Sequence, residues 1–251
     1  WRHCQIRQPD RQACTRERVT SVNRLYENYL SDHAGYEDAS SLGLVLDRDL
    51  LAMIPSRSAR CLDLGCGQGG LSAYLRERGV SNAFGVDISP EQVSHAHALG
   101  RDYVNQSDVA DALIGSEDQW DVVTAFDFLE HLDPEAVLPM LEAARGALSK
   151  NGIMIARVPN AAGPVYGRIQ FGDFTHKSMF TSRSLQQLAK AARFSGADFR
   201  EVPPLVHGFK SAARRAIWGV FAGSTRVAIA AESGTLRGHL VTSNIMAYLH
   251  A

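Results

Sequence analysis

The sequence has little of several features that would narrow its function. It carries only four cysteines in 251 residues, and their spacing is not typical of a zinc site or a disulfide framework: Cys4, Cys14, Cys61 and Cys66. It has no excess of charge, because 26 basic residues against 27 acidic ones give a net charge of −1. No global attraction to nucleic acid is therefore expected. Few, unpaired cysteines favour reduced thiols and a cytoplasmic location.

Longer patterns are missing as well. The chain contains no apolar run long enough to cross a bilayer, no visible signal peptide, no internal repeat and no low-complexity tract. Its first residue is Trp1 and not Met, which indicates a fragment or a processed or trimmed chain. With 45% hydrophobic residues over this length, the composition predicts one large α/β domain or a core domain with appendages.

The stretch from Ala59 to Gly70, with the sequence ARCLDLGCGQGG, carries the strongest functional signal. A short apolar run ends at Asp63 and Leu64. Four glycines follow within six positions: Gly65, Gly67, Gly69 and Gly70. A strand that breaks into such a turn and then into a helix, here predicted over Leu71 to Gly79, lets a small polar ligand approach the backbone closely.

Two cofactor classes use a turn of this kind. Gly65, Gly67 and Gly70 fit the dinucleotide pattern G-x-G-x-x-G, while Asp63 begins a second pattern, D-x-G-x-G-x-G, that ends at Gly69. A carboxylate two positions before the first glycine would repel a pyrophosphate and suits a cationic ligand. In this motif the sequence resembles the class I S-adenosylmethionine (SAM)-dependent methyltransferases, whose ligand carries a sulfonium and an ammonium.

The resemblance covers most of Arg60 to Arg193 and implies SAM as methyl donor and S-adenosylhomocysteine (SAH) as product. The implied cofactor contacts in the glycine stretch are Asp63, Gly65, Cys66, Gly67 and Gly69. Asp87 ends the apolar run Ala83 to Ile88, twenty positions after Gly67 (87 − 67 = 20), where a carboxylate can accept hydrogen bonds from both ribose hydroxyls. A helix-start carboxylate is the alternative for Asp87.

Further cofactor contacts are implied at the ends of later strands. Asp108 is the position at which the family often binds the adenine amino group, although an Asx-turn is the alternative there. The strand predicted over Trp120 to Phe126 runs into Asp127, where the family meets the methionine half of SAM. The implied contacts beyond the glycine stretch are Asp87, Ile88, Asp108, Val109, Phe126 and Asp127.

The stretch from Val158 to Thr181 is too long for a plain connector and is expected to face the acceptor. It carries three aromatic residues and three polar ones: Tyr166, Phe171, Phe174, Asp173, Thr175 and His176. The combination V-P-N, G-D-F-T-H and F-T resembles methyltransferases encoded among bacterial glycan-synthesis enzymes. The expected acceptor is therefore a hydroxyl of a sugar, a glycan or a similar metabolite, bound by a substrate loop at about 159–182.

An alcohol acceptor must lose its proton, so a histidine near it is expected to act as a base. His176 lies in the long loop, with Asp173 three residues before it as a carboxylate that can orient the ring. His131 follows the Trp120 to Phe126 strand and is expected to be a positioning group. The sequence thus favours His176 as base. These residues and Asp133 could meet at a metal, but no ligand spacing demands one, and none is expected.

The predicted fold is a three-layer, Rossmann-like α/β sheet of seven strands with helices on both faces. Residues 1–57 are predicted as an N-terminal segment and helical cap, and 58–251 as the SAM-binding methyltransferase domain. The last strand, over Gly238 to Leu249, is expected to be antiparallel. A helical insert at about 209–231 precedes it. Its basic start allows contact with a membrane that bears a lipid-linked acceptor, while a packed surface helix or an oligomer contact is favoured.

Three other functions remain open. One is N- or C-methylation of a small metabolite, which needs no dedicated base. The second is an NAD-dependent oxidoreductase, against which Asp63 and the paired Asp87 and Asp108 argue. The third is a module that binds SAM without catalysis.

Overall fold

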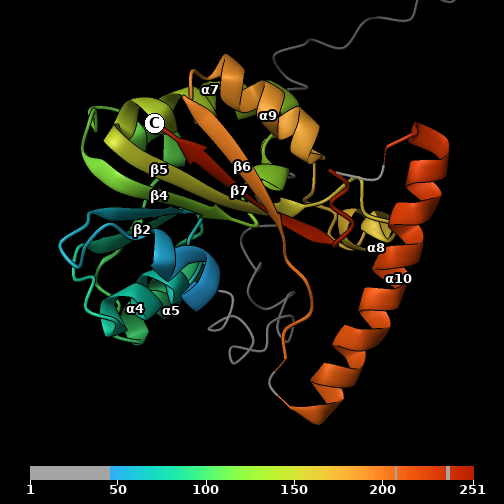
Figure 1. Ribbon diagram of the computed structural model, residues 1–251. Helices are drawn as coiled ribbons and strands as arrows, with labels where there is room; N and C mark the ends of the chain where they lie inside the picture. Colours follow the sequence, from blue (N-terminus) through green and yellow to red (C-terminus); the bar gives the residue numbers. More distant parts are fainter. Residues whose placement is uncertain (1–45, 207, 236–237) are drawn as a thin grey trace, which may run out of the picture.

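The computed structural model describes residues 46–206, 208–235 and 238–251 (Figure 1). Within the N-terminal cap the sequence predicts a helix over Val19 to Leu30, a second helix over Leu42 to Met53, and a lid of Tyr26, Tyr29, His33 and Tyr36. The first helix, the start of the second and the lid lie outside the described residues. The described chain begins with a π-helical turn, η1 (Leu46–Leu50), and a 3-10 turn, η2 (Leu51–Met53). Both turns replace the regular helix that was expected there.

Seven strands of the described chain form one sheet in the order β3-β2-β1-β4-β5-β7-β6. They are β1 (Cys61–Leu64), β2 (Ala83–Asp87), β3 (Val104–Gln106), β4 (Trp120–Phe126), β5 (Leu148–Pro159), β6 (Gly196–Glu201) and β7 (Asn244–His250). The first five pair in parallel, and β7 runs antiparallel to both β5 and β6. This topology confirms the predicted seven-stranded sheet with an antiparallel last strand.

The strand order reverses between β1 and β4, which are hydrogen-bonded neighbours in the sheet. In an open α/β sheet, ligands bind outside the carboxyl ends of the strands at such a reversal. The residues that follow β1, β2 and β4 are therefore brought to one edge of the sheet.

Helices cover both faces of the sheet, as predicted (Figure 1). They are α4 (Gly70–Glu77), α5 (Pro90–Ala98), α6 (Val109–Leu113), η3 (Leu129–His131), α7 (Pro134–Ala147), α8 (Tyr166–Gln170), α9 (Ser182–Ala191) and α10 (Phe209–Ser233). One apolar cluster joins the sheet to α7 and α9, and a second joins it to α4 and η1. Local signals set the helix starts. Ser89 accepts a hydrogen bond from the Gln92 N–H at the start of α5, and Thr181 and Ser184 form a capping box for α9.

The last strand and the long loop also differ from the prediction. The last strand begins at Asn244 and not at Gly238, because side chains bind the backbone just before it. The Asn160 amide donates to the carbonyls of Leu240 and Thr242, and the Val241 N–H donates to Glu201. The long loop also contains the short helix α8, which the sequence did not predict.

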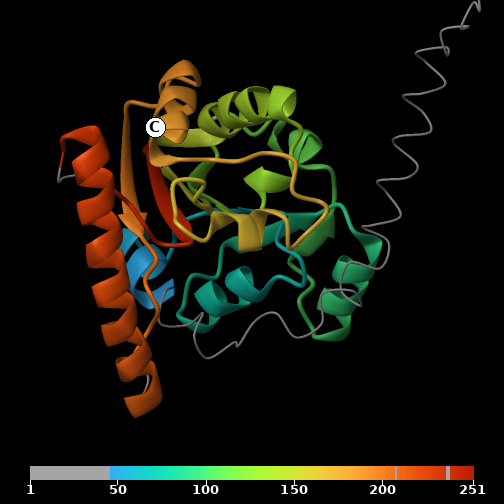
Figure 2. The same ribbon diagram turned by 90° about the vertical axis from the view of Figure 1, so that its right-hand side faces the viewer.

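The helix α10 lies at the periphery of the domain in both views (Figure 1, Figure 2). It spans the predicted insert and continues to Ser233. None of the helices in the described parts of the chain is both long enough and apolar enough to cross a membrane.

Candidate active site

The glycine turn after β1 is held by its own N–H groups. The Cys66 N–H donates to the Val86 carbonyl at 3.0 Å, and the Gly69 N–H donates to the Cys66 carbonyl at 2.9 Å. The Gly67 N–H donates to Oδ2 of Asp87 at 2.8 Å. Because protein oxygens occupy these three donors, the turn does not present them to a phosphate. This geometry favours a cationic ligand over the pyrophosphate of a dinucleotide.

Gly67 and Gly69 are both required by positive φ angles, but their surroundings differ. A Cβ atom on Gly69, at φ +73°, would lie 2.4 Å from Cγ2 of Val104, so this position is closed by the protein itself. On Gly67, at φ +54°, the nearest atom would be Oε1 of Gln92 at 3.7 Å. Gly69 therefore serves packing, while a Cβ atom on Gly67 would make only ordinary contacts with Gln92.

Two carboxylates lie at the ends of β1 and β2. Asp63 is buried and accepts a hydrogen bond from the Thr124 hydroxyl at 2.7 Å. Burial raises the pKa of Asp63 to about 7, an effect that the nearby Asp87 increases. Oδ1 of Asp87 accepts the Ser89 N–H, and burial raises the pKa of Asp87 as well. A cation bound beside this pair would favour the charged carboxylates.

Three other residues predicted to contact the cofactor differ in their exposure: Ile88, Asp108 and Val109. Ile88 is 55% exposed beside Asp87, so its side chain is available to an adenine ring. Asp108 is exposed, and its Oδ1 accepts the Ala110 N–H and caps α6. Val109 packs in the apolar core. Contact of Asp108 and Val109 with adenine stays a prediction.

The Cys66 side chain packs against Gly85, a residue that was not singled out from the sequence. A Cβ atom on Gly85 in β2 would lie 2.6 Å from Sγ of Cys66, so only glycine leaves room for the thiol. Burial raises the pKa of the Cys66 thiol, which keeps it neutral. A glycine inside a short strand is a known mark of such a close approach and could have signalled it.

Asp127, predicted to contact the methionine half of SAM, is paired within the protein. Both of its oxygens bind Arg157, with Nε to Oδ1 at 3.0 Å and Nη2 to Oδ2. The guanidinium carbon lies 5.5 Å from the ring centre of Phe126. Arg157 was not among the predicted site residues. It sits on β5, next to Phe126 in the sheet, and the pairing of these strands is what places it there.

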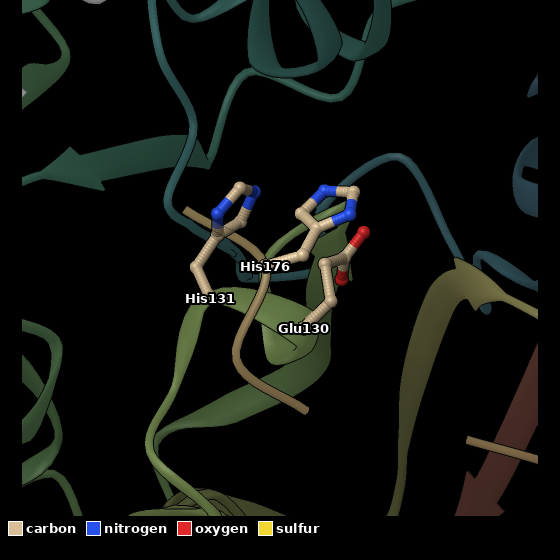
Figure 3. A group of neighbouring side chains, drawn as sticks. All are labelled: Glu130, His131 and His176. Carbon is tan, nitrogen blue, oxygen red and sulfur yellow. The ribbon is translucent and has the colours of Figure 1, made fainter. Parts of the chain in front are cut away.

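A second group of side chains gathers beyond β4 (Figure 3). The rings of His131 and His176 lie 4.9 Å apart between centres, with Glu130 beside them. One ligand atom of each residue lies within 4.8 Å of the others, so the three could share a divalent cation. Glu130 is buried and its Oε2 has no hydrogen-bond partner among the described residues. Burial, with the nearby Asp127, raises its pKa well above the ordinary value.

Asp173, Thr175 and His131 form a chain of hydrogen bonds. Oγ1 of Thr175 lies 2.6 Å from Oδ1 of Asp173 and 2.8 Å from Nδ1 of His131. Since a hydroxyl has one proton and the carboxylate can only accept, Thr175 donates to Asp173 and accepts from His131. The neutral His131 ring therefore carries its proton on Nδ1, and Nε2 is the nitrogen able to take one up. Burial, with the nearby His176, lowers the pKa of His131 to about 4.

His176, the base that the sequence favoured, stands beside this chain and not in it. Its Nε2 lies 4.0 Å from Oδ2 of Asp173, too far for a hydrogen bond. Its Nδ1 is buried with no hydrogen-bond partner in the described residues. In the structure, the imidazole held by hydrogen bonds is therefore that of His131, which the sequence analysis expected to be a positioning group.

The loop reaches η3 through backbone contacts that the sequence does not reveal. The N–H groups of Lys177 and Ser178 both donate to the Glu130 carbonyl, at 2.7 and 3.0 Å. These bonds bring Thr175 and His176 against His131 across more than forty residues of chain. Phe171 and Phe174 of the same loop are 77% and 93% exposed. Both precede His176 in the loop that is expected to face the acceptor.

Comparison with known proteins agrees with this geometry. A profile of the methyltransferase domain matches residues 41–196, well over half of the chain. The chain belongs to the class I SAM-dependent methyltransferases. Its cofactor is SAM, with SAH as product. Both follow the sequence-based expectation.

Individual curated relatives match this chain over only about half of their own length. A stretch of 119 residues is 34% identical to the ubiquinone biosynthesis O-methyltransferase of Cereibacter sphaeroides, covering 45% of this chain and 47% of that protein. A stretch of 131 residues is 31% identical to the protein of the same name from a Ruegeria species, covering 50% and 51%. The chain spans about half the length of the curated relatives it matches.

Solved structures support the fold. A SAM-dependent methyltransferase from Archaeoglobus fulgidus has a TM-score of 0.64 at 18% identity, over 91% of this chain and 99% of that one. The complex of DhpI with SAH has a TM-score of 0.56 at 15% identity, over 93% and 95%. At such identities the likeness concerns the fold alone.

Proposed function

We propose that this protein is an O-methyltransferase that uses His131 as a base on the hydroxyl of a small-molecule acceptor. The observation that carries the proposal is the chain from Asp173 through Thr175 to His131, at the carboxyl end of β4. Bound SAM supplies a methyl group activated by its sulfonium. As the acceptor oxygen forms its bond to that methyl carbon and the carbon–sulfur bond breaks, Nε2 of His131 takes the hydroxyl proton and SAH leaves.

Asp173 and Thr175 act through His131 in this scheme. They hold the ring in one tautomer and orientation, and the carboxylate stabilises the imidazolium that forms. The Thr175 bonds also lower the pKa of Asp173, which keeps it charged. Much of the remaining acceleration comes from holding donor and acceptor in line.

We infer that the acceptor hydroxyl is phenolic. A base whose pKa is lowered to about 4 accepts protons weakly, and it is better matched to an acidic phenol than to an aliphatic alcohol. The names of the curated relatives, ubiquinone biosynthesis O-methyltransferases, support this class. The exposed rings of Phe171 and Phe174 offer faces on which an aromatic acceptor can stack.

A sugar or glycan hydroxyl is the second candidate. The observation in its favour is the loop sequence around Gly172 to His176, which resembles methyltransferases of bacterial glycan synthesis. The same exposed phenylalanines can pack against the apolar face of a sugar ring.

A labelled-methyl assay tests these proposals. SAM with a labelled methyl group is incubated with the protein and a panel of phenols, sugars, glycolipids and amines, and the product is identified by mass spectrometry. Methylation at oxygen of a phenol is the expected result. Methylation only at nitrogen or carbon would overturn the proposed base, and absence of transfer together with tight SAM binding would leave a binding module.

A thermal-shift comparison of SAM with NAD separates the cofactor classes in the same samples. A shift with SAM alone is expected.

The predicted cytoplasmic location and the extent of the domain over 58–251 stay predictions.

A further inference from the structure

The helix α10 presents an apolar face to solvent. The two buried residues of this 25-residue helix, Ser211 and Ala222, are about three turns apart and lie on one side. Phe209, Val220 and Val227 lie on the opposite side and are 91%, 77% and 62% exposed. Ile217 lies next to them at 72% exposure. Single exposed apolar residues are normal, but four large ones along one helix face are not.

Contacts on the other side fix which way this face points. Nη2 of Arg226 lies 2.6 Å from both carboxylate oxygens of Glu201 at the end of β6. Glu201 also accepts the Val241 N–H, which ties the helix to the segment before β7. The helix is therefore anchored to the sheet edge by its inner side, and the exposed apolar residues lie on its other side. Figure 2 shows the helix at the periphery of the domain.

The charges of α10 are unequal along its length. Lys210, Arg214 and Arg215 lie in its first two turns and are exposed. Its single acidic residue, Glu232, is next to last. At about 100° per residue, Lys210 and Arg214 follow Ile217 around the helix, at the border of the apolar face, while Arg215 lies nearer the side of Ser211. Positive charges that border an exposed apolar face are the pattern of a helix that lies in the interface of an anionic membrane.

We propose that α10 binds the surface of an anionic lipid bilayer, with Phe209, Ile217 and Val220 inserted among the acyl chains and Lys210 and Arg214 on the headgroups. A second copy of the chain is a poorer occupant, because it brings the same three positive charges and little negative charge to meet them. The proposal does not depend on the identity of the methyl acceptor, since binding is measured without methyl transfer.

Vesicle sedimentation with the full chain tests the proposal. Binding is expected to vesicles of phosphatidylcholine with phosphatidylglycerol, to weaken as salt is raised, and to be much weaker with phosphatidylcholine alone. The double variant Ile217→Ser/Val220→Ser should bind at least about tenfold more weakly. Both side chains are exposed, so the fold should persist. Ile114→Ser, which removes a residue 74% exposed outside α10, is the matched control and should bind normally.

A second pair of variants tests the charges. Lys210→Gln/Arg214→Gln should weaken binding by about fivefold for each charge removed. Arg183→Gln/Lys190→Gln, on α9, removes two exposed charges elsewhere and should change it little. Equal binding of neutral vesicles, no binding of anionic ones, or normal binding by the α10 variants would overturn the proposal. A self-association that is abolished by Ile217→Ser/Val220→Ser, without vesicle binding, would assign the face to a second copy.

Discussion

The cofactor side and the acceptor side of the site differ in the groups that hold their functional side chains in place. On the cofactor side, Asp87 is held by backbone N–H groups, those of Gly67 and Ser89. Asp63 is held by the Thr124 hydroxyl, and burial raises the pKa of both carboxylates. On the acceptor side, side chains orient one another, from Asp173 through Thr175 to His131. The comparison teaches that binding of the donor and activation of the acceptor are separable, so substitutions should divide them.

The largest effect is expected at His131. His131→Gln should lower kcat by about 10²–10⁴ while SAM affinity stays nearly unchanged, because the oriented proton acceptor is lost. His176→Gln is the matched control and should lower kcat by less than about tenfold. Steady-state kinetics with calorimetric SAM titration checks both. The reverse ranking would restore His176 as the base.

Asp87 should show the opposite division. Asp87→Ala removes a charged acceptor for the ribose and for the Gly67 N–H, with an expected loss of about 1.5–3 kcal/mol in SAM binding. The value of kcat at saturating SAM should change little. Asp108→Ala, at the exposed cap of α6, should have the smaller effect. Unchanged SAM affinity in a folded Asp87→Ala protein would remove the ribose assignment.

Within the cofactor side, substitutions of Gly67 and Gly69 should separate an effect on SAM binding from an effect on stability. Gly69→Ala should lower the free energy of unfolding by about 2–5 kcal/mol, through a clash with Val104 and an unfavourable φ. Gly67→Ala should lower it by only about 1–2 kcal/mol and act mainly on SAM affinity. Thermal unfolding with and without SAM separates the two. Equal stability losses would mean that Gly67 serves packing as well.

The smallest effect is a dependence on pH. The folded-state pKa of Asp63 is raised to about 7, so protonation stabilises the free protein, and this contribution is lost as the pH rises through that value. Cationic SAM favours the carboxylate, so its affinity should rise between about pH 6 and pH 8, by at most about tenfold per unit. Calorimetry should show the rise, and Asp63→Asn should flatten it. A flat profile in the unsubstituted protein would separate Asp63 from the ligand's charge.

The cofactor side could be predicted because its parts are close together in sequence. Asp63, the glycine turn and Asp87 belong to one strand–helix–strand unit, whose geometry follows from local pattern. The acceptor side joins β4, β5 and a distant loop. Arg157 lies 30 residues after Asp127 and meets it only through strand pairing. The choice between His131 and His176 depended on the hydroxyl of Thr175, whose direction is set by loop contacts that no local pattern encodes.

The most direct test is Thr175→Val, a change of nearly equal volume that removes the hydroxyl between Asp173 and His131. Single-turnover methyl transfer should slow by about 10–100-fold, with SAM affinity changed by less than about twofold. The wild-type rate should also survive treatment with a chelator. An unchanged rate in the variant, an equal loss of SAM binding, or a wild-type rate abolished by the chelator would contradict the account of His131 as a base held by its neighbours.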